Sequence, residues 1–184
     1  LCKYSTDDEE LCDMQQCPKH CKCIGSALEC NDTMLSTIPQ YSLNVKAIIL
    51  RTKMKHLESG EITLNFLYRL DLSCNNLAQL KYNSFIHYPH LRELDLSNNY
   101  LSSIEPHSFA GLKFLKRLSV FGNIFTSIMS YSFYGLTSVV AFNLSGSYVT
   151  LIHEKAFCNM EMLSALDLSM NKVQALGEIG RAHV

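Results

Sequence analysis

The sequence predicts an α/β solenoid of stacked repeats, with a curved parallel sheet on its concave face, an irregular or short-helical convex side and a disulfide-stapled N-terminal cap. Three observations support this fold class. A pattern of apolar residues recurs every 24 residues through the last two thirds of the chain. Within each period, a short segment alternates apolar residues with others, as a strand does when only one face is buried. Six of the eight cysteines fall within the first thirty residues.

Each repeat follows the pattern L-x-x-L-x-L-x-x-N-x-L-x-x-L-x-x-x-x-F, in which other apolar residues replace some of the leucines. The first full copy consists of Leu67, Leu70, Leu72, Asn75, Leu77, Leu80 and Phe85, and later copies begin at Leu91, Leu115, Val139 and Leu163. This pattern resembles the leucine-rich repeat. Because one copy cannot bury its apolar residues alone, we expect the copies to stack and their L-x-L segments to form one sheet. We assign residues 45–177 to one degenerate copy, four full copies and a truncated last copy.

The asparagine of the pattern is expected to bond backbone groups of the adjoining turn, because a buried amide needs hydrogen-bond partners. Ser147 replaces it in the fourth full copy, which predicts a softer turn there. In the degenerate copy the spacing differs by one residue, and either Thr52 or Lys53 stands where the asparagine belongs. Such departures are common in terminal repeats, which meet a cap on one side.

A cysteine cluster lies directly before the repeats, in residues 17–44. Its spacing, Cys17-Pro18-x-x-Cys21-x-Cys23 followed by Cys30, resembles the N-terminal cap of extracellular leucine-rich-repeat proteins. The resemblance implies the disulfides Cys17–Cys23 and Cys21–Cys30, which would hold together a unit too small to be stabilised by burial alone. A zinc site is the alternative, although zinc ligands usually form two pairs separated by a longer loop.

The cysteine content indicates an extracellular chain, either the ectodomain of a membrane protein or a secreted protein. Asn31 and Asn143 begin N-x-S/T acceptor sequences for glycosylation, in keeping with this location. Two further cysteines, Cys74 and Cys158, lie within the repeats, and we expect them to be unpaired and mostly buried.

Residues 1–12 contain an acidic run between Cys2 and Cys12 and resemble the tail of an LDL-receptor class A module, truncated at its start. Modules of this kind fold around calcium, so the resemblance implies that Asp8 and Glu9 belong to an incomplete calcium site. The alternative is a solvated acidic linker with one local disulfide. We expect no cofactor in the repeats.

The order of these two segments resembles the ectodomain of the relaxin receptors, which are G-protein-coupled receptors. The resemblance implies a ligand-binding ectodomain fragment that recognises a peptide or protein on its concave face and meets the membrane only through downstream segments. The alternative is a secreted or matrix protein, or a Toll-type receptor, that acts in adhesion or innate recognition. Residues 178–184 do not continue the last repeat and match the translated sequence of a sequencing adapter, so we expect a non-native tail there.

Candidate ligand-binding residues are the strand residues that point away from the core. Asp71, Glu93 and Asp95 bring three carboxylates together on neighbouring strands, and Phe121 adds an aromatic ring one repeat further on. The resemblance to relaxin receptors implies that such acids meet arginines of the ligand. The simpler alternative is that Leu-Asp-Leu-Ser is only a common form of this repeat.

Other functional classes find little support in the sequence. It contains no nucleophile elbow, phosphate loop or zinc-hydrolase motif, so we expect no enzymatic activity. A net charge of −1 and a pI near 6.7 give no sign of a nucleic-acid partner.

Overall fold

The computed structural model describes residues 17–31, 38, 45–57 and 63–174 with their side chains, and only the backbone of residues 3–4, 10–11 and 175–176. Near the N-terminus, β1 (Lys3–Tyr4) pairs antiparallel with β2 (Glu10–Leu11). The predicted calcium ligands Asp8 and Glu9, and the predicted adapter-derived tail at residues 178–184, lie outside the described residues.

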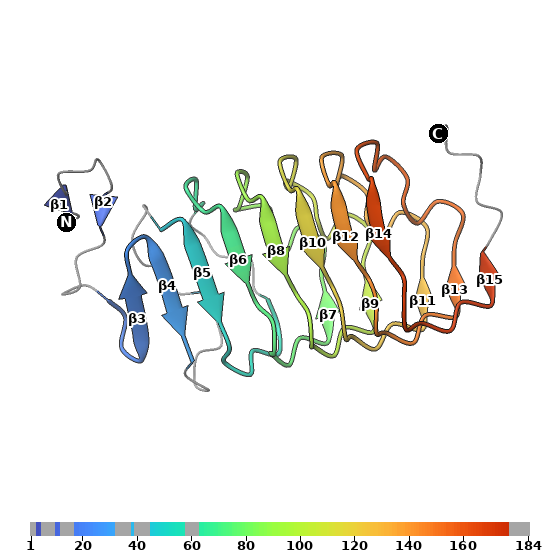
Figure 1. Ribbon diagram of the computed structural model, residues 1–184, viewed down its shortest axis with the longest axis horizontal. Helices are drawn as coiled ribbons and strands as arrows, with labels where there is room; N and C mark the ends of the chain where they lie inside the picture. The colour runs from blue at the N-terminus through green and yellow to red at the C-terminus, as the bar shows by residue number, and fades with distance from the viewer. Residues whose placement is uncertain are drawn as a thin grey trace.

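An eight-stranded sheet forms one face of the solenoid (Figure 1). Its spatial order is β14-β12-β10-β8-β6-β5-β4-β3, and every pair is parallel except β3 with β4. The strands are β3 (Cys21–Ile24), β4 (Ala27–Cys30), β5 (Ala47–Leu50), β6 (Arg69–Asp71), β8 (Glu93–Asp95), β10 (Arg117–Ser119), β12 (Ala141–Asn143) and β14 (Ala165–Asp167). Equivalent residues of successive repeats stand side by side, as the sequence period predicts.

The opposite layer consists of turns and two-residue strands (Figure 1). The strands β7 (Gln79–Leu80) and β9 (Ser103–Ile104) form one small sheet, and β11 (Ser127–Ile128), β13 (Leu151–Ile152) and β15 (Ala175–Leu176) form another. Within the described part of the chain there is no helix. The convex side is therefore irregular and not short-helical, and the described part of the solenoid is built from strands and turns.

A column of stacked phenylalanines fills the space between the two layers. Phe85, Phe109 and Phe133 are fully buried, and Phe157 is partly buried. Successive ring centroids are 5.6, 5.9 and 5.6 Å apart. Because this phenylalanine recurs every 24 residues, the rings form a continuous aromatic spine, which links each repeat to the next.

The pattern asparagines form a second ladder that runs along the stack. The side-chain nitrogen of Asn99 donates to the carbonyl oxygens of Leu96 in its own repeat and Leu72 in the preceding one, both at 3.0 Å. Its side-chain oxygen accepts a hydrogen bond from the backbone N–H of Leu77 at 3.0 Å. Asn123 makes the equivalent bonds one repeat further on. The asparagine thus joins two repeats rather than only stabilising its own turn.

Ser147 breaks this ladder. Its hydroxyl is buried and has no hydrogen-bond partner among the described residues, because the side chain is too short to reach the groups that asparagine bonds in other repeats. We expect Ser147→Asn to raise the free energy of unfolding by about 1–2 kcal/mol, since the new amide would bond Val120, Leu144 and Phe125 backbone groups. Urea unfolding measures this gain. The matched control Ser147→Ala should be nearly neutral, and equal stability of both variants would refute the explanation.

The degenerate copy occupies its expected place in the sheet. Strand β5 pairs in parallel with β6, with Ile48 beside Leu70. Thr52 takes the asparagine position rather than Lys53: it is fully buried, and both its N–H and its hydroxyl donate to the side-chain oxygen of Asn75, at 2.9 and 3.2 Å. The degenerate copy therefore takes part in the asparagine ladder through its bonds to Asn75 of the next repeat.

The N-terminal cap is stapled by two disulfides. Cys17 is bonded to Cys23 and Cys21 to Cys30, the pairing that the family resemblance implies. Cys21 and Cys30 face each other across the antiparallel β3–β4 pair, and β4 then pairs in parallel with β5. The cap thereby covers the edge that the first repeat would otherwise leave open.

The expectation of buried free thiols is wrong for Cys74. This residue is exposed, whereas Cys158 is partly buried. The physical reason is the turn after each strand of the concave face, where one residue adopts a left-handed conformation and points outward. The residues at this position are Cys74, Asn98, Gly122, Gly146 and Met170, with φ between 52° and 66°.

Candidate ligand-binding face

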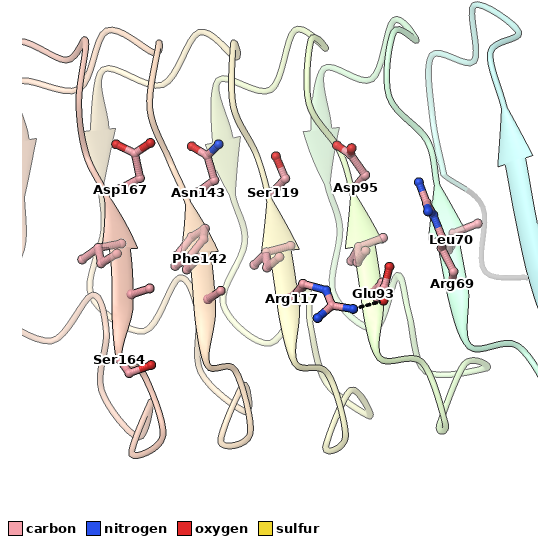
Figure 2. Close-up of a pocket in the computed structure, with 15 residues that line it drawn as sticks. Arg69, Leu70, Glu93, Asp95, Arg117, Ser119, Phe142, Asn143, Ser164 and Asp167 are labelled. Atoms are coloured by element: carbon pink, nitrogen blue, oxygen red, sulfur yellow. Dashed lines mark hydrogen bonds and ion pairs between the residues drawn. The ribbon is translucent and has the colours of Figure 1, made fainter.

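Two rows of side chains run across the concave face, because the strands are short and in parallel register. The first residue of each strand contributes to one row, which comprises Arg69, Glu93, Arg117, Ala141 and Ala165. The last residue contributes to the other row, which comprises Asp71, Asp95, Ser119, Asn143 and Asp167. Figure 2 shows Asp95, Ser119, Asn143 and Asp167 standing in line on four adjacent strands. Neighbours within a row are about 4.8 Å apart.

A groove with a volume of about 650 Å³ lies over these rows and extends from β6 to β14. In the row of first strand residues, Arg69, Glu93 and Arg117 line its β6 to β10 part, whereas Ala141 and Ala165 line it on β12 and β14. The two alanines leave room that arginine and glutamate fill on the earlier strands. The groove is therefore more open over β12 and β14, where Asn143 and Asp167 of the other row are its polar side chains.

Asp71 does not contribute to the groove. It is only 3% exposed, and one of its oxygens accepts hydrogen bonds from the backbone N–H and the hydroxyl of Ser73, at 3.0 and 2.6 Å. Its other oxygen lies 3.5 Å from Arg51 and 3.7 Å from Arg69. This carboxylate is fully engaged within the protein and is a structural anchor between two repeats.

Glu93 lines the groove, but it is paired with Arg117 (dashed line in Figure 2). The hydrogen bond and charge of Glu93 raise the pKa of the Arg117 guanidinium. The pair bridges β8 and β10, so a ligand that used Glu93 would first have to compete with this arginine.

Asp95 and Asp167 are the two carboxylates of the groove that form no ion pair within the described residues. In each, one oxygen accepts the backbone N–H two residues further on, at 2.8 Å for Asp95 and 2.9 Å for Asp167. Hydrogen bonds from the hydroxyl and N–H of Ser169 hold the pKa of Asp167 below its ordinary value. Asp167 is therefore ionised at neutral pH, and its charge faces the groove.

Phe121 lies outside the groove lining. It follows β10 and packs over the next turn, where a β-carbon on Gly146 would stand only 2.7 Å from a ring carbon. Gly146 also has a φ of 62°, so both its conformation and the ring favour glycine. The structure thus brings Glu93 and Asp95 together in the groove and leaves Asp71 and Phe121 apart from it.

The two acceptor asparagines differ in their surroundings. Asn31 is exposed at the end of β4. Asn143 lines the groove, and its side-chain oxygen accepts hydrogen bonds from the N–H and hydroxyl of Ser145, at 2.9 and 2.7 Å. A glycan on Asn143 would occupy the groove, so glycosylation at this residue and ligand binding in the groove exclude each other.

The sequence places Asp167 and Arg117 among the strand residues of the concave face, but it did not single them out as ligand-binding candidates. Asp167 could have been found, because it holds the same repeat position as Asp71 and Asp95. The role of Arg117 could not be found in this way, because it depends on an ion pair with Glu93, which is 24 residues away in the sequence. Within the described residues, no group of three metal-ligating side chains comes together, and no helix is long and apolar enough to cross a membrane.

Several solved structures share this architecture. A chain of the TLR13–ssRNA13 complex matches with a TM-score of 0.66 and 26% identity, covering 83% of this chain and 19% of the other. A chain of the Drosophila Toll–Spatzle complex matches with a TM-score of 0.70 and 26% identity, covering 79% and 20%. A chain of the octameric complex of Latrophilin 3, Unc5D and FLRT2 shares the fold, with a TM-score of 0.69 and 20% identity over 88% and 58%. The chain thus spans about a fifth of the two Toll-type chains.

A search of curated proteins finds no significant match. The leucine rich repeat family model, in contrast, matches residues 66–125 and 115–173, which together cover more than half of the chain. The repeat pattern, the stacked parallel strands and this match agree, and the chain belongs to the leucine rich repeat family.

Proposed function

We propose that this chain is part of the ligand-binding ectodomain of a membrane receptor, and that a peptide or protein ligand binds in the concave groove. The observation that carries the proposal is the pair of open carboxylates, Asp95 and Asp167, at two points of a groove that is otherwise neutral or internally paired. Asp95 and Asp167 stand three strands apart, which corresponds to about 14 Å.

This geometry favours a basic, extended ligand. Two arginines separated by three residues lie about 13 Å apart in an extended peptide, which matches the two carboxylates. Ala141 and Ala165 leave room beside Asp167 for an apolar side chain between the two arginines. Carboxylate–arginine contacts would set the register, and burial of the apolar side chain would add affinity.

A synthetic peptide with the motif Arg-x-x-x-Arg and one apolar residue between the arginines tests the groove. Its affinity can be measured by fluorescence anisotropy. We expect Asp95→Asn and Asp167→Asn each to weaken binding about two- to fivefold, as loss of a solvent-accessible ion pair does. Asparagine keeps the oxygen that accepts the turn hydrogen bond, so the fold is preserved. The control is Glu154→Gln, at an exposed residue after β13. An unchanged affinity in the double variant, or an equal loss in the control, would count against the groove.

We propose further that the receptor is of the relaxin-receptor type and signals through a G-protein-coupled domain. The support is the order of an acidic Cys-bounded segment, a Cys-rich cap and the repeats. A Toll-type receptor is the second candidate, supported by the similarity to chains of the TLR13 and Toll complexes. Sequencing the complete transcript separates them. Seven apolar spans after the repeats are expected; one span followed by a cytoplasmic domain would instead support the Toll type.

A further inference from the structure

A second surface lies at the edge of the sheet where the concave strands begin. Lys46, Tyr68, Arg92 and Lys116 each stand one residue before a strand, in four successive repeats. The backbone N–H of each later residue donates to the carbonyl of the preceding one, at 2.7 Å for Tyr68 and 2.8 Å for Arg92 and Lys116. The four side chains therefore follow one another in a straight line, at steps of about 4.8 Å. We call this line the N-terminal edge strip.

Exposed aromatic rings border the strip. Phe66 and Phe114, in the turns that precede β6 and β10, are 60% and 50% exposed, although phenylalanine is normally buried. His90 stands between them in the stack and lies parallel to Phe114, with ring centroids 5.8 Å apart. Within the strip, the Arg92 guanidinium lies 5.6 Å from the ring centre of Tyr68. The repeat pattern explains none of these rings, because they occupy its variable positions.

The strip carries three cations, of which Arg92 lies over the Tyr68 ring and Lys116 contacts the sulfur of Met162. Lys46, Arg92 and Lys116 form no ion pair with any residue whose side chain is described. Arg51, Arg69 and Arg117, in contrast, each contact a carboxylate of the concave face. The protein thus neutralises the arginines of the groove but leaves three positive charges in line at the edge. Uncompensated charge of one sign creates a local field that attracts ligands of the opposite sign.

A groove with a volume of about 510 Å³ lies at the start of the strip, between Lys46, Phe66 and Tyr68. It combines Lys46 with two exposed rings, and the carboxylate of Glu93 in its lining is already paired with Arg117, so it can hold a ring-shaped unit together with an anionic group. Arg69 and Glu93 line both this groove and the concave groove, so the two adjoin, whereas Asp95 and Asp167 stand at the other ends of the strands.

We propose that the N-terminal edge strip binds a sulfated polysaccharide that lies along the direction of repeat stacking. Three cations in one row, with Tyr68 between Lys46 and Arg92, fit a linear polyanion, and sulfate groups accept hydrogen bonds from arginine and lysine. The exposed rings can stack against the flat apolar faces of sugar rings. The disulfide-bonded cap places the chain in the extracellular space, where sulfated polysaccharides occur. Single-stranded nucleic acid shares the charge and stacking chemistry and is the competing ligand in the test.

Heparin of defined length is the probe, and surface plasmon resonance of the folded chain gives its affinity. With about three cation–sulfate contacts, the affinity should fall roughly twentyfold between 50 and 200 mM salt. The double variant Arg92→Glu/Lys116→Glu should bind at least about tenfold more weakly, because both charges become repulsive. The matched control Lys81→Glu/Lys155→Glu makes the same change in net charge at exposed residues of the opposite layer, and it should bind like the wild type.

Two further measurements make the test specific. Tyr68→Ala/Phe114→Ala should weaken heparin binding without changing its salt dependence, because the rings contribute contacts but no charge. Hyaluronan, which is equally long but carries no sulfate, should bind much more weakly than heparin. The proposal is overturned if the two charge-reversal variants behave alike, if hyaluronan binds as tightly as heparin, or if a single-stranded oligonucleotide of equal charge binds more tightly.

Discussion

Replacing Phe133 with alanine is expected to lower the free energy of unfolding by about 3–5 kcal/mol. Phe133 is fully buried and touches three rings: Phe109 at 5.9 Å, Phe142 at 4.7 Å and Phe157 at 5.6 Å between centroids. Truncation would remove a ring from the middle of the aromatic spine, and the rigid stack on both sides could not close the cavity. Chemical denaturation followed by circular dichroism measures the loss.

Phe114→Ala is the matched control, because it makes the same chemical change at a ring that is 50% exposed. Its effect should stay within about 1 kcal/mol, as is typical for surface substitutions. A similar loss of stability in both variants would mean that the spine is not the main link between the repeats.

The second large effect is expected for Asn99→Ala, which should cost about 2–4 kcal/mol. The substitution would leave the buried N–H of Leu77 without the side-chain oxygen that it bonds now. It would also remove one of two amide donors from the carbonyls of Leu72 and Leu96, which keep their bonds from Asn75 and Asn123. Because a solenoid is held together by contacts between neighbours, the defect should also weaken the repeat before it.

Hydrogen exchange distinguishes this effect from a local turn defect. The amides of the copy that begins at Leu67 should exchange faster in Asn99→Ala, since the lost bonds to Leu72 and Leu77 belong to that copy. Ser102→Ala, at an exposed residue of the same turn region, is the control and should leave exchange unchanged. Faster exchange confined to residues after Asn99 would contradict the role of the ladder in joining repeats.

The sequence was sufficient to predict the solenoid because one 24-residue period sets the positions of the strands, the asparagines and the phenylalanines. The same spacing that places Leu94 beside Leu118 also aligns Asn99 with Asn123 and Phe109 with Phe133. The convex side was less predictable. Its segments are short and dominated by turns, so their conformation depends on contacts with the neighbouring repeats rather than on local propensity.

The repeat pattern does not predict which carboxylates of the concave face are available to a ligand. Asp71 and Asp95 hold the same repeat position, yet Asp71 is closed off while Asp95 remains available. The difference arises from Arg51, which stands in the degenerate copy and reaches over from it. Glu93 is engaged for the same kind of reason, by Arg117 of the next repeat. Such pairings are decided by side chains that are distant in sequence and meet only after stacking.

Glycan occupancy at Asn143 tests the proposed role of the concave groove most directly, because it requires no knowledge of the ligand. The ectodomain can be secreted from cells of the source organism or a related one, and its peptides analysed by mass spectrometry after enzymatic deglycosylation in heavy-oxygen water. If the groove binds a ligand, Asn143 should be unmodified and Asn31, which is exposed on the cap, should be free to carry a glycan. Full occupancy of Asn143 would fill the groove with sugar and contradict the account.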